Sequence, residues 1–263
     1  MSPEASSMRV PITVYDLAFW MPVEVGEVRI MAQLDTGSAD MNVTEGFSAN
    51  FADVGPTSIR GAFRQMKTRS VRLPPLKWLG KLRPDLVARV RPDFDEGLPF
   101  QAGVTLGNSV LLAQPLYLDF VRIQIGIEPL DGYRYVLKVP LQEKHGLPFL
   151  ELTLGDKKLT AAFDLGAGVS VLNERISFSG QEMILSDEGE DSTRESRRFS
   201  LYRGPPISLD GHLLCQSEYA TIELKEIEDR LGSPIEFILG ANTLLRIGGI
   251  WKLDLQGGYA EWG

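Results

Sequence analysis

The sequence of 263 residues has little of the chemistry on which many protein classes depend. A single cysteine, Cys215, excludes an internal disulfide framework and a metal site built from several cysteines. Because the only histidines are His145 and His212, a histidine-rich metal site is not expected either. No apolar run reaches the roughly 20 residues that a membrane-spanning helix needs. These absences favour a globular protein whose chemistry rests on other side chains.

The remaining composition is that of an ordinary globular chain. It is 43% hydrophobic and 24% charged, with a net charge of −8, which is too apolar for a disordered protein. The length suits one large domain or two small ones. The first ten residues contain no apolar segment of the kind found in signal peptides. The cytoplasm is therefore the expected compartment, unless a leader was removed from the chain.

The chain repeats itself at a shift of 129 positions, at which Asp35 falls on Asp164. No gap is needed in this alignment over the first repeated motifs. Further along, the shift grows to 133, and the segment Leu106–Leu111 then falls on Leu239–Leu244. The repeat predicts that the chain arose by internal duplication.

Two homologous halves follow from this repeat, namely residues 8–125 and 135–263. The segment 126–134 between them is rich in turn-forming residues and is predicted to be the joint. Each half contains many short apolar segments separated by glycine and proline, which favours strands. We therefore predict an all-β, bilobal double β-barrel with two pseudo-symmetric halves.

Alternating apolar residues around a tight turn predict a β-hairpin early in each half. In the first half the hairpin covers residues 21–32 and turns at Gly26. In the second half it covers residues 149–163 and turns at Gly155. A short helix is predicted to begin near Leu244.

Each hairpin leads into an acidic turn that contains glycine. The first turn is Leu34-Asp35-Thr36-Gly37-Ser38, and the second is Phe163-Asp164-Leu165-Gly166-Ala167-Gly168. The apolar strand places the aspartate inside the protein, and the glycine permits a sharp turn. Two such turns on a pseudo-two-fold axis would bring Asp35 and Asp164 together, where the two carboxyl groups share one proton. One carboxylate would then activate water, and the other carboxyl would protonate the carbonyl oxygen of a scissile bond.

These motifs resemble those of the aspartic proteases of the retropepsin and pepsin type. The segment Leu34–Ser38 is similar to the catalytic signature of that family. The segment Ile238-Leu239-Gly240, with the residues after it, is similar to the family's downstream hydrophobic-hydrophobic-glycine element. A weaker first-half copy of that element is Thr105-Leu106-Gly107. Because both halves contain both elements in order, the resemblance covers nearly the whole chain.

The resemblance implies an aspartic endopeptidase with Asp35 and Asp164 as its catalytic residues. Both aspartates come from one chain, so catalysis would not require a homodimer. The partner would be a peptide or protein substrate bound as an extended strand, with no metal, no organic cofactor and no membrane. The residues implied to support the two aspartates are Thr36, Gly37, Ser38, Leu165, Gly166 and Ala167.

Further roles are implied by the same resemblance. Thr36 would form a hydrogen bond across the interface of the two halves, as the threonine grip of the family does. Gly37 and Gly166 would offer backbone groups to the peptide. A flap hairpin that covers the substrate is expected within Thr57–Arg72, around Arg60-Gly61-Ala62-Phe63, and Arg60 and Gly61 would contact the substrate.

One departure from the family pattern opens an alternative. Leu165 stands where the family usually has Thr or Ser, so one of the two grip hydroxyls is missing. A catalytically weak or inactive relative that binds peptides is therefore the leading alternative. The turn 163–168 also resembles the second phosphate loop of actin-like and Hsp70-like ATPases, and 35–38 would correspond to the first. That fold needs long helices and more residues between its loops.

Charge is unevenly distributed along the chain. The segment Arg60–Arg91 contains ten Lys and Arg residues and one acid, Asp85, for a net charge of +9. We interpret it as a solvated face of the flap and neighbouring strands, with recognition of an acidic substrate as the alternative. The acidic run Asp187–Asp191 is expected to be a flexible loop or an electrostatic counterpart of the basic segment. Because no nucleic-acid-binding motif is present, no nucleic-acid partner is expected.

Overall fold

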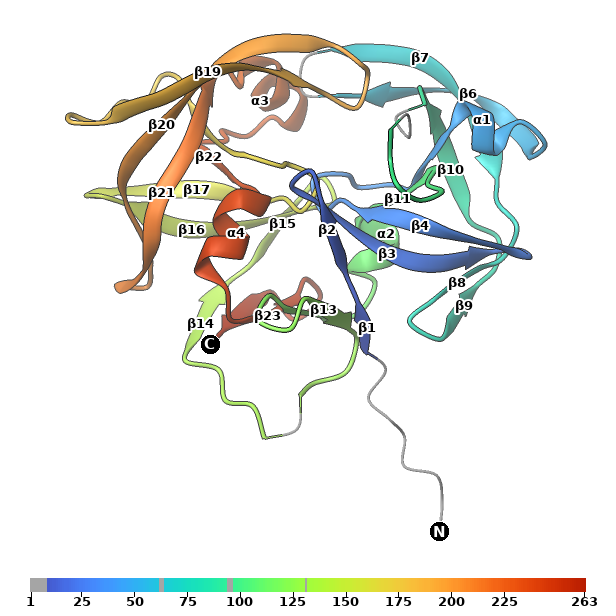
Figure 1. Cartoon of the computed structure of the whole chain (residues 1–263), viewed down its shortest axis with the longest axis horizontal. Helices are drawn as coiled ribbons and strands as arrows, with labels where there is room; N and C mark the ends of the chain where they lie inside the picture. Colours follow the sequence, from blue (N-terminus) through green and yellow to red (C-terminus); the bar gives the residue numbers. More distant parts are fainter. Residues whose placement is uncertain (1–8, 62–63, 94–96, 131) are drawn as a thin grey trace.

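The computed structural model describes residues 9–61, 64–93, 97–130 and 132–263. Within these ranges the regular structure is mostly β, in three sheets, and no helix exceeds seven residues. Figure 1 shows the two halves beside one another, with the third sheet below them. The predicted all-β, bilobal architecture is confirmed. None of the helices in the described part is long and apolar enough to span a membrane.

The first half is built on a ten-stranded sheet. Its strands, in order across the sheet, are β6 (Ala52–Arg60), β7 (Gln65–Arg72), β10 (Val87–Arg91), β5 (Asn42–Thr44), β11 (Val104–Leu106), β4 (Val28–Leu34), β3 (Ala18–Val25), β8 (Leu76–Trp78) and β9 (Lys81–Arg83), with β2 (Thr13–Tyr15) paired to β3. The strands β3 and β4 form the predicted hairpin. Gly26 in its turn has a φ of +59°, a conformation that favours glycine.

The second half is built on an eight-stranded sheet. Its strands, in order, are β15 (Gln142–Lys144), β16 (Leu147–Leu154), β17 (Lys157–Phe163), β22 (Phe237–Leu239), β18 (Ser170–Asn173), β21 (His212–Ile222), β20 (Ser196–Leu209) and β19 (Glu182–Glu190). The order β16-β17-β22-β18-β21-β20-β19 repeats the order β3-β4-β11-β5-β10-β7-β6 of the first half. The two halves therefore share one strand arrangement, as their aligned motifs predict.

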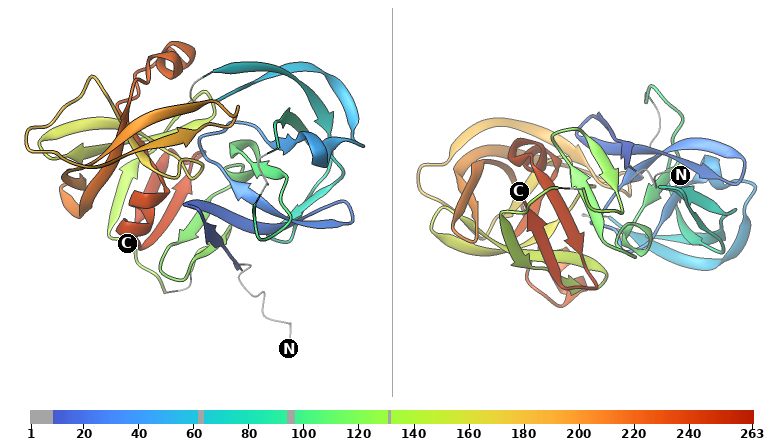
Figure 2. Two further views of the ribbon diagram at one scale, coloured as in Figure 1. Left: turned by 45° about the horizontal axis from the view of Figure 1, so that its top comes forward. Right: turned by 90° about the horizontal axis from the view of Figure 1, so that it is seen from below.

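A six-stranded sheet takes strands from both halves and joins them (Figure 2). Its order is β1 (Arg9–Pro11), β13 (Gln124–Gly126), β12 (Leu116–Asp119), β23 (Ile250–Asp254), β24 (Tyr259–Trp262) and β14 (Leu137–Pro140). At its centre Leu118 pairs with Trp251, and Leu116 pairs with Leu253. Because the repeat aligns Leu118 with Leu253, the two pairs exchange places under a two-fold rotation. The pseudo-symmetry axis thus passes between β12 and β23.

The helices are short and follow particular strands. They are α1 (Glu45–Ser48), α2 (Asn108–Leu111), α3 (Lys225–Leu231) and α4 (Ala241–Ile247). The helix predicted near Leu244 is α4, which begins three residues earlier, directly after Gly240. The helices α2 and α4 take equivalent places after β11 and β22.

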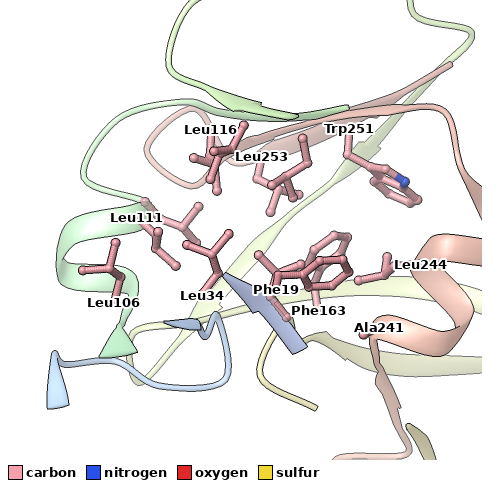
Figure 3. Close-up of a cluster of buried hydrophobic side chains, with 14 of the residues drawn as sticks. Phe19, Leu34, Leu106, Leu111, Leu116, Phe163, Ala241, Leu244, Trp251 and Leu253 are labelled. Atoms are coloured by element: carbon pink, nitrogen blue, oxygen red, sulfur yellow. The ribbon is translucent and has the colours of Figure 1, made fainter. Parts of the chain in front are cut away.

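The main hydrophobic core runs through both halves (Figure 3). Leu34 and Phe163, the last residues of β4 and β17, are fully buried in it. Phe163 packs edge-on against Trp251 of the six-stranded sheet, with ring centroids 5.3 Å apart. Because side chains alternate along a strand, burial of Leu34 and Phe163 in this core turns the next residue toward the opposite face. That next residue is an aspartate in both halves.

The acidic run was wrongly predicted as a loop, because most of it lies within strand β19. This strand pairs with β20, and Glu188 is directly opposite Arg198. Opposite charges facing each other across two strands stabilise the pairing, so an acidic sequence forms a regular strand here. Only Asp191, at the end of the run, lies in the turn of this hairpin.

Candidate active site

Each aspartate leaves the end of a strand in the middle of its sheet. In the first half β4 runs parallel to β11, with Leu34 opposite Leu106, and the Asp35 amide donates to the Leu106 carbonyl at 3.0 Å. In the second half β17 runs parallel to β22, and the Asp164 amide donates to the Leu239 carbonyl, also at 3.0 Å. The same backbone bonds therefore fix the position of both carboxyl groups.

The glycines of the two Leu-Gly elements are required by crowding. A side chain at Gly240 would come within 2.7 Å of the carbonyl oxygen of Ala167. The amide of Ala241 donates to that carbonyl at 2.8 Å, and in the first half the amide of Asn108 donates to the Ser38 carbonyl at 2.8 Å. These bonds attach each Leu-Gly element to the acidic turn of its own half, although the motifs lie far apart in the sequence.

The two acidic turns meet, and the glycine of each faces the aspartate of the other. A side chain added at Gly37 would collide with the carboxyl group of Asp164, and one added at Gly166 would collide with that of Asp35. The amide of Gly37 donates to Oδ1 of Asp164 across the interface at 3.1 Å. The structure thus brings Asp35 and Asp164 together at the interface of the two halves.

The two carboxyl groups are not equivalent in their hydrogen bonds. Oδ1 of Asp164 accepts three backbone N–H groups, from Gly37 at 3.1 Å, Gly166 at 2.8 Å and Ala167 at 3.2 Å. The Asp35 carboxyl accepts a backbone hydrogen bond from Gly37. Because N–H donors stabilise a negative charge, Asp164 is the better site for the carboxylate form.

The pKa values of both groups reflect this arrangement. Burial, followed by the charge of Asp164, raises the pKa of Asp35 to about 7. Burial also raises the pKa of Asp164, while its three N–H donors act in the opposite direction. The two groups are joined by a hydrogen bond that favours protonated Asp35 and ionised Asp164. As the pH falls through about 7 the pair therefore takes up one shared proton, located on Asp35, before Asp164 is protonated at lower pH.

Thr36 connects the two turns through a buried hydroxyl group. Its Oγ1 donates to the Phe163 carbonyl at 2.7 Å and accepts from the Leu165 amide at 2.9 Å. Both contacts cross the interface between the halves. The side chain of Leu165 is fully buried in the apolar core. The interface thus has a one-sided grip, in which Thr36 supplies the hydroxyl and Leu165 supplies a backbone donor.

Comparison with solved structures identifies the architecture. The chain is similar to the crystal structure of an aspartic proteinase from Irpex lacteus, with a TM-score of 0.58 and 11% sequence identity. The alignment covers 96% of each chain. The chain has the aspartic proteinase fold. At this identity the likeness shows the fold alone. No family model matches the sequence, and no curated protein matches it.

The aspartic proteinase fold does not fit the ATPase alternative. The actin-like fold needs long helices, whereas the helices in the described ranges span at most seven residues. The glycine-rich turns are also already engaged, because Gly37 and Gly166 both donate to Asp164.

The remaining turn residues act within their own half. The Ser38 hydroxyl donates to the Asp40 carbonyl at 2.8 Å rather than to Asp35.

Asn108 is a supporting residue whose role the sequence did not reveal. Its side-chain amide donates to the Thr36 carbonyl and to the Gly146 carbonyl, both at 2.7 Å, and so links the first turn to the second half.

The flap expected in the first half is the hairpin of β6 and β7. Arg60 ends β6 and is exposed, and Gly61 follows it in the turn. Ala62 and Phe63, also expected at the tip, lie outside the described residues. Arg230 of α3 donates to the Gly61 carbonyl at 2.9 Å, so this tip contacts the second half.

The equivalent hairpin of the second half, β19 and β20, reaches the same place (Figure 1). Arg64 donates to the carbonyl of Thr193 at 2.8 Å and to its hydroxyl at 3.3 Å. Arg64 also forms an ion pair with Glu195 at 3.5 Å. The basic segment and the acidic hairpin therefore meet at their tips, and we call this contact the tip latch.

One charged residue near the aspartates was missed as an individual site. Arg91, at the end of β10, is only 6% exposed, and its charge lowers the pKa of Asp35. The sequence shows it as one of ten basic residues in the segment Arg60–Arg91. Because alternation along β10 places Arg91 on the face of Val87 and Arg89, the sequence carries no signal that separates it from the other basic residues of that segment.

Proposed function

We propose that the protein is an aspartic endopeptidase that hydrolyses peptide bonds with Asp35 and Asp164. The observation that carries the proposal is the meeting of two carboxyl groups at the interface of two related halves, each beside the glycine of the other. The aspartic proteinase fold supports a peptide substrate. The raised pKa of Asp35, to about 7, supports the single shared proton that this chemistry needs.

The difference between the two aspartates assigns their roles in the proposal. Ionised Asp164 accepts a proton from a water molecule, whose oxygen then bonds to the carbonyl carbon of the peptide. Protonated Asp35 gives its proton to the carbonyl oxygen, which forms a neutral tetrahedral diol. The proton held by Asp164 then passes to the peptide nitrogen and the C–N bond breaks, while Asp35 regains a proton from a diol hydroxyl. Both carboxyl groups return to their starting states.

The substrate in this proposal binds as an extended strand along the two turns. The N–H groups of Gly37 and Gly166 are engaged with Asp164. The peptide would therefore bond to the carbonyl groups of these glycines rather than to their amides. We propose that Arg60 and Gly61, in the hairpin of the tip latch, cover the bound peptide.

A diverse peptide mixture analysed by mass spectrometry tests this function. Wild-type protein should cleave peptides at acidic to neutral pH, and Asp35→Asn should not. The variant Asp156→Asn, which changes an exposed aspartate in the β16–β17 turn, is the matched control and should cleave normally. Cleavage that survives Asp35→Asn would contradict the proposal.

Leu165 favours one second candidate, a peptide-binding relative that turns over slowly or not at all. The missing hydroxyl leaves the grip one-sided, and geometry at such a site depends on its supporting contacts. In that case folded wild-type protein would bind peptides with an affinity that Asp35→Asn changes little, and would release no fragments. The same peptide mixture, followed by binding measurements, separates the two candidates.

A further inference from the structure

The two faces of strand β4 differ sharply in what surrounds them. Ile30, Ala32 and Leu34 point into the main core and are at most 3% exposed. Gln33 lies on the opposite face and is half-buried. Because side chains two residues apart share a face, Gln33 and Asp35 lie on the same side of the strand. Gln33 is therefore the nearest side chain along β4 that shares the face of the aspartate.

Arg91 fixes the orientation of Gln33. Nη2 of Arg91 donates to Oε1 of Gln33 at 3.1 Å. A guanidinium group only donates hydrogen bonds, so the atom of Gln33 that faces it must be the carbonyl oxygen. The Nε2 amide group of Gln33 is consequently directed away from Arg91. Because Arg91 is only 6% exposed, its side chain holds this orientation with little freedom to move.

The second half has an apolar pair in the equivalent place. Ala162 precedes Asp164 by two residues, as Gln33 precedes Asp35. Ile222 is opposite Asn173 in a parallel pairing, as Arg91 is opposite Thr44. Thr44 and Asn173 are themselves equivalent, since they differ by the same 129 positions as the two aspartates. Ala162 and Ile222 therefore replace Gln33 and Arg91.

These apolar residues belong to a separate cluster on the aspartate-bearing face of the second sheet. Ala162 packs there with Phe149, Leu224 and Ile235, and Ile222 packs against them. The two sides of the aspartate pair thus differ in chemistry. The first-half side has an oriented amide donor backed by a buried cation, and the second-half side is apolar.

We propose that Gln33 is a specificity-determining residue that recognises a substrate side chain with a carboxylate or carboxamide oxygen, and that Arg91 is its positioning residue. The side chain across the scissile bond would be apolar, to match Ala162 and Ile222. The preferred substrate is then a peptide with Gln, Glu, Asn or Asp on one side of the cleaved bond and an apolar residue on the other. This inference rests on the proposed function.

The size of the preference follows from hydrogen-bond energetics. A hydrogen bond made to the substrate, or a donor left unpaired on burial, changes a rate or binding constant by about tenfold. Replacement of substrate Gln by Met, which has similar length and no strong acceptor, should therefore lower kcat/KM about tenfold in the wild type. A merely structural Gln33 would leave this ratio near one.

The test uses paired peptides that differ only by Gln or Met, or by Glu or Leu, beside the cleaved bond. Gln33→Glu is the informative variant, because its carboxylate can still pair with Arg91 but offers no N–H donor. It should lose the tenfold preference for acceptor side chains while its unfolding temperature stays close to that of wild type. Arg91→Met should weaken the preference by freeing the amide of Gln33. Arg72→Met removes a charge from an exposed surface pair with Asp85 and should keep the wild-type ratio.

Two readouts separate failure of this inference from failure of the proposed function. Asp35-dependent cleavage with the same Gln/Met ratio in wild type and Gln33→Glu would overturn the role of Gln33 alone. Absence of cleavage would overturn the proposed function. In that case, binding of the same peptide pairs to Asp35→Asn protein still reports the preference, and equal affinities for Gln and Met peptides would overturn the inference.

Discussion

The two halves present the same strands to the two aspartates but surround them with different side chains. In the first half Thr36 supplies a buried hydroxyl, and Arg91 and Gln33 line the face that carries Asp35. In the second half leucine and isoleucine stand in the equivalent places, at positions 165 and 222. The two halves thus share the backbone that positions the carboxyl groups, while the side chains around them differ. Because the charge of Arg91 opposes a proton on Asp35, the asymmetry of the pair comes from the three N–H donors of Asp164.

The largest effect is expected from replacing each of the two carboxyl groups, in turn, by an amide. Asp35→Asn and Asp164→Asn should each lower kcat by at least about 10²–10⁴, the usual contribution of a general acid or base. Steady-state kinetics on a cleaved peptide measures this loss. Retention of activity in either variant would show that the two halves do not act as a pair.

The same two variants should differ in stability. The pKa of Asp35 is about 7 in the folded protein, against an ordinary value of 3.8. The contribution of Asp35 to the free energy of unfolding is therefore fully present below pH 3.8 and is lost as the pH rises through about 7. Asp35→Asn removes this loss and should stabilise the protein at pH 7–8 by a few kcal/mol, since one pKa unit corresponds to about 1.4 kcal/mol. Asp164→Asn should increase stability less, because a neutral amide oxygen accepts the hydrogen bonds of the three N–H groups more weakly than a carboxylate does. Thermal unfolding between pH 4 and 8 measures both.

Removal of the Thr36 hydroxyl tests the one-sided grip between the two halves. Thr36→Val leaves the Phe163 carbonyl and the Leu165 amide without their buried partner, and should lower the free energy of unfolding by about 2–5 kcal/mol. Thr105→Val is the matched control, because the Thr105 hydroxyl is buried without a hydrogen-bond partner among the described residues. The control should be neutral or stabilising. Equal losses in urea unfolding of both variants would show that Thr36 carries no special contact.

The next prediction concerns the charge of Arg91, which has no equivalent in the second half. The positive charge of Arg91 lowers the pKa of Asp35, so Arg91→Met should raise that pKa above about 7. Activity that needs the shared proton should then persist to higher pH. The change in kcat/KM at any one pH should stay below about tenfold, the factor that corresponds to a shift of one pKa unit. A pH profile of kcat/KM whose alkaline limb is unmoved, or moves to lower pH, would contradict this electrostatic role.

The smallest effect is expected at the tip latch. Arg64→Ala removes an ion pair between half-exposed groups and two hydrogen bonds to Thr193. The loss of stability should be about 1 kcal/mol or less, because exposed pairs contribute little. Faster hydrogen exchange at the hairpin tips should accompany it, since the tips would separate more often. Unchanged exchange at residues 191–195 would show that Arg64 does not hold the tips together.

The sequence alone predicts the fold well, because the information is local. The repeated Asp-x-Gly turns, the Leu-Gly elements and the two hairpins each occupy a few neighbouring residues, and the constant shift between copies relates them. The pairings of Leu34 with Leu106 and of Phe163 with Leu239 follow the aligned motifs directly.

The contacts that the sequence does not predict are those between distant strands. Burial of Arg91 depends on which side chains lie on the same face of β4 and β10, and the composition of its segment gives no sign of this. The sequence predicts a loop at the acidic run 187–191 because its pairing partner, basic β20, cannot be recognised from the run itself. The tip latch likewise depends on the length of two hairpins in separate halves.

The central pairing of β12 with β23 also sets a time scale for assembly of the pair. Asp119 ends β12 and Ile250 begins β23, so roughly 130 residues of synthesis separate the two strands. At a ribosomal rate of about 5–20 residues per second, this corresponds to a delay of about 7–26 s. During that interval β12 pairs with β13 on one side and has no β23 on the other. The six-stranded sheet that joins the two halves behind the carboxyl groups is therefore complete only once its last strands have left the ribosome.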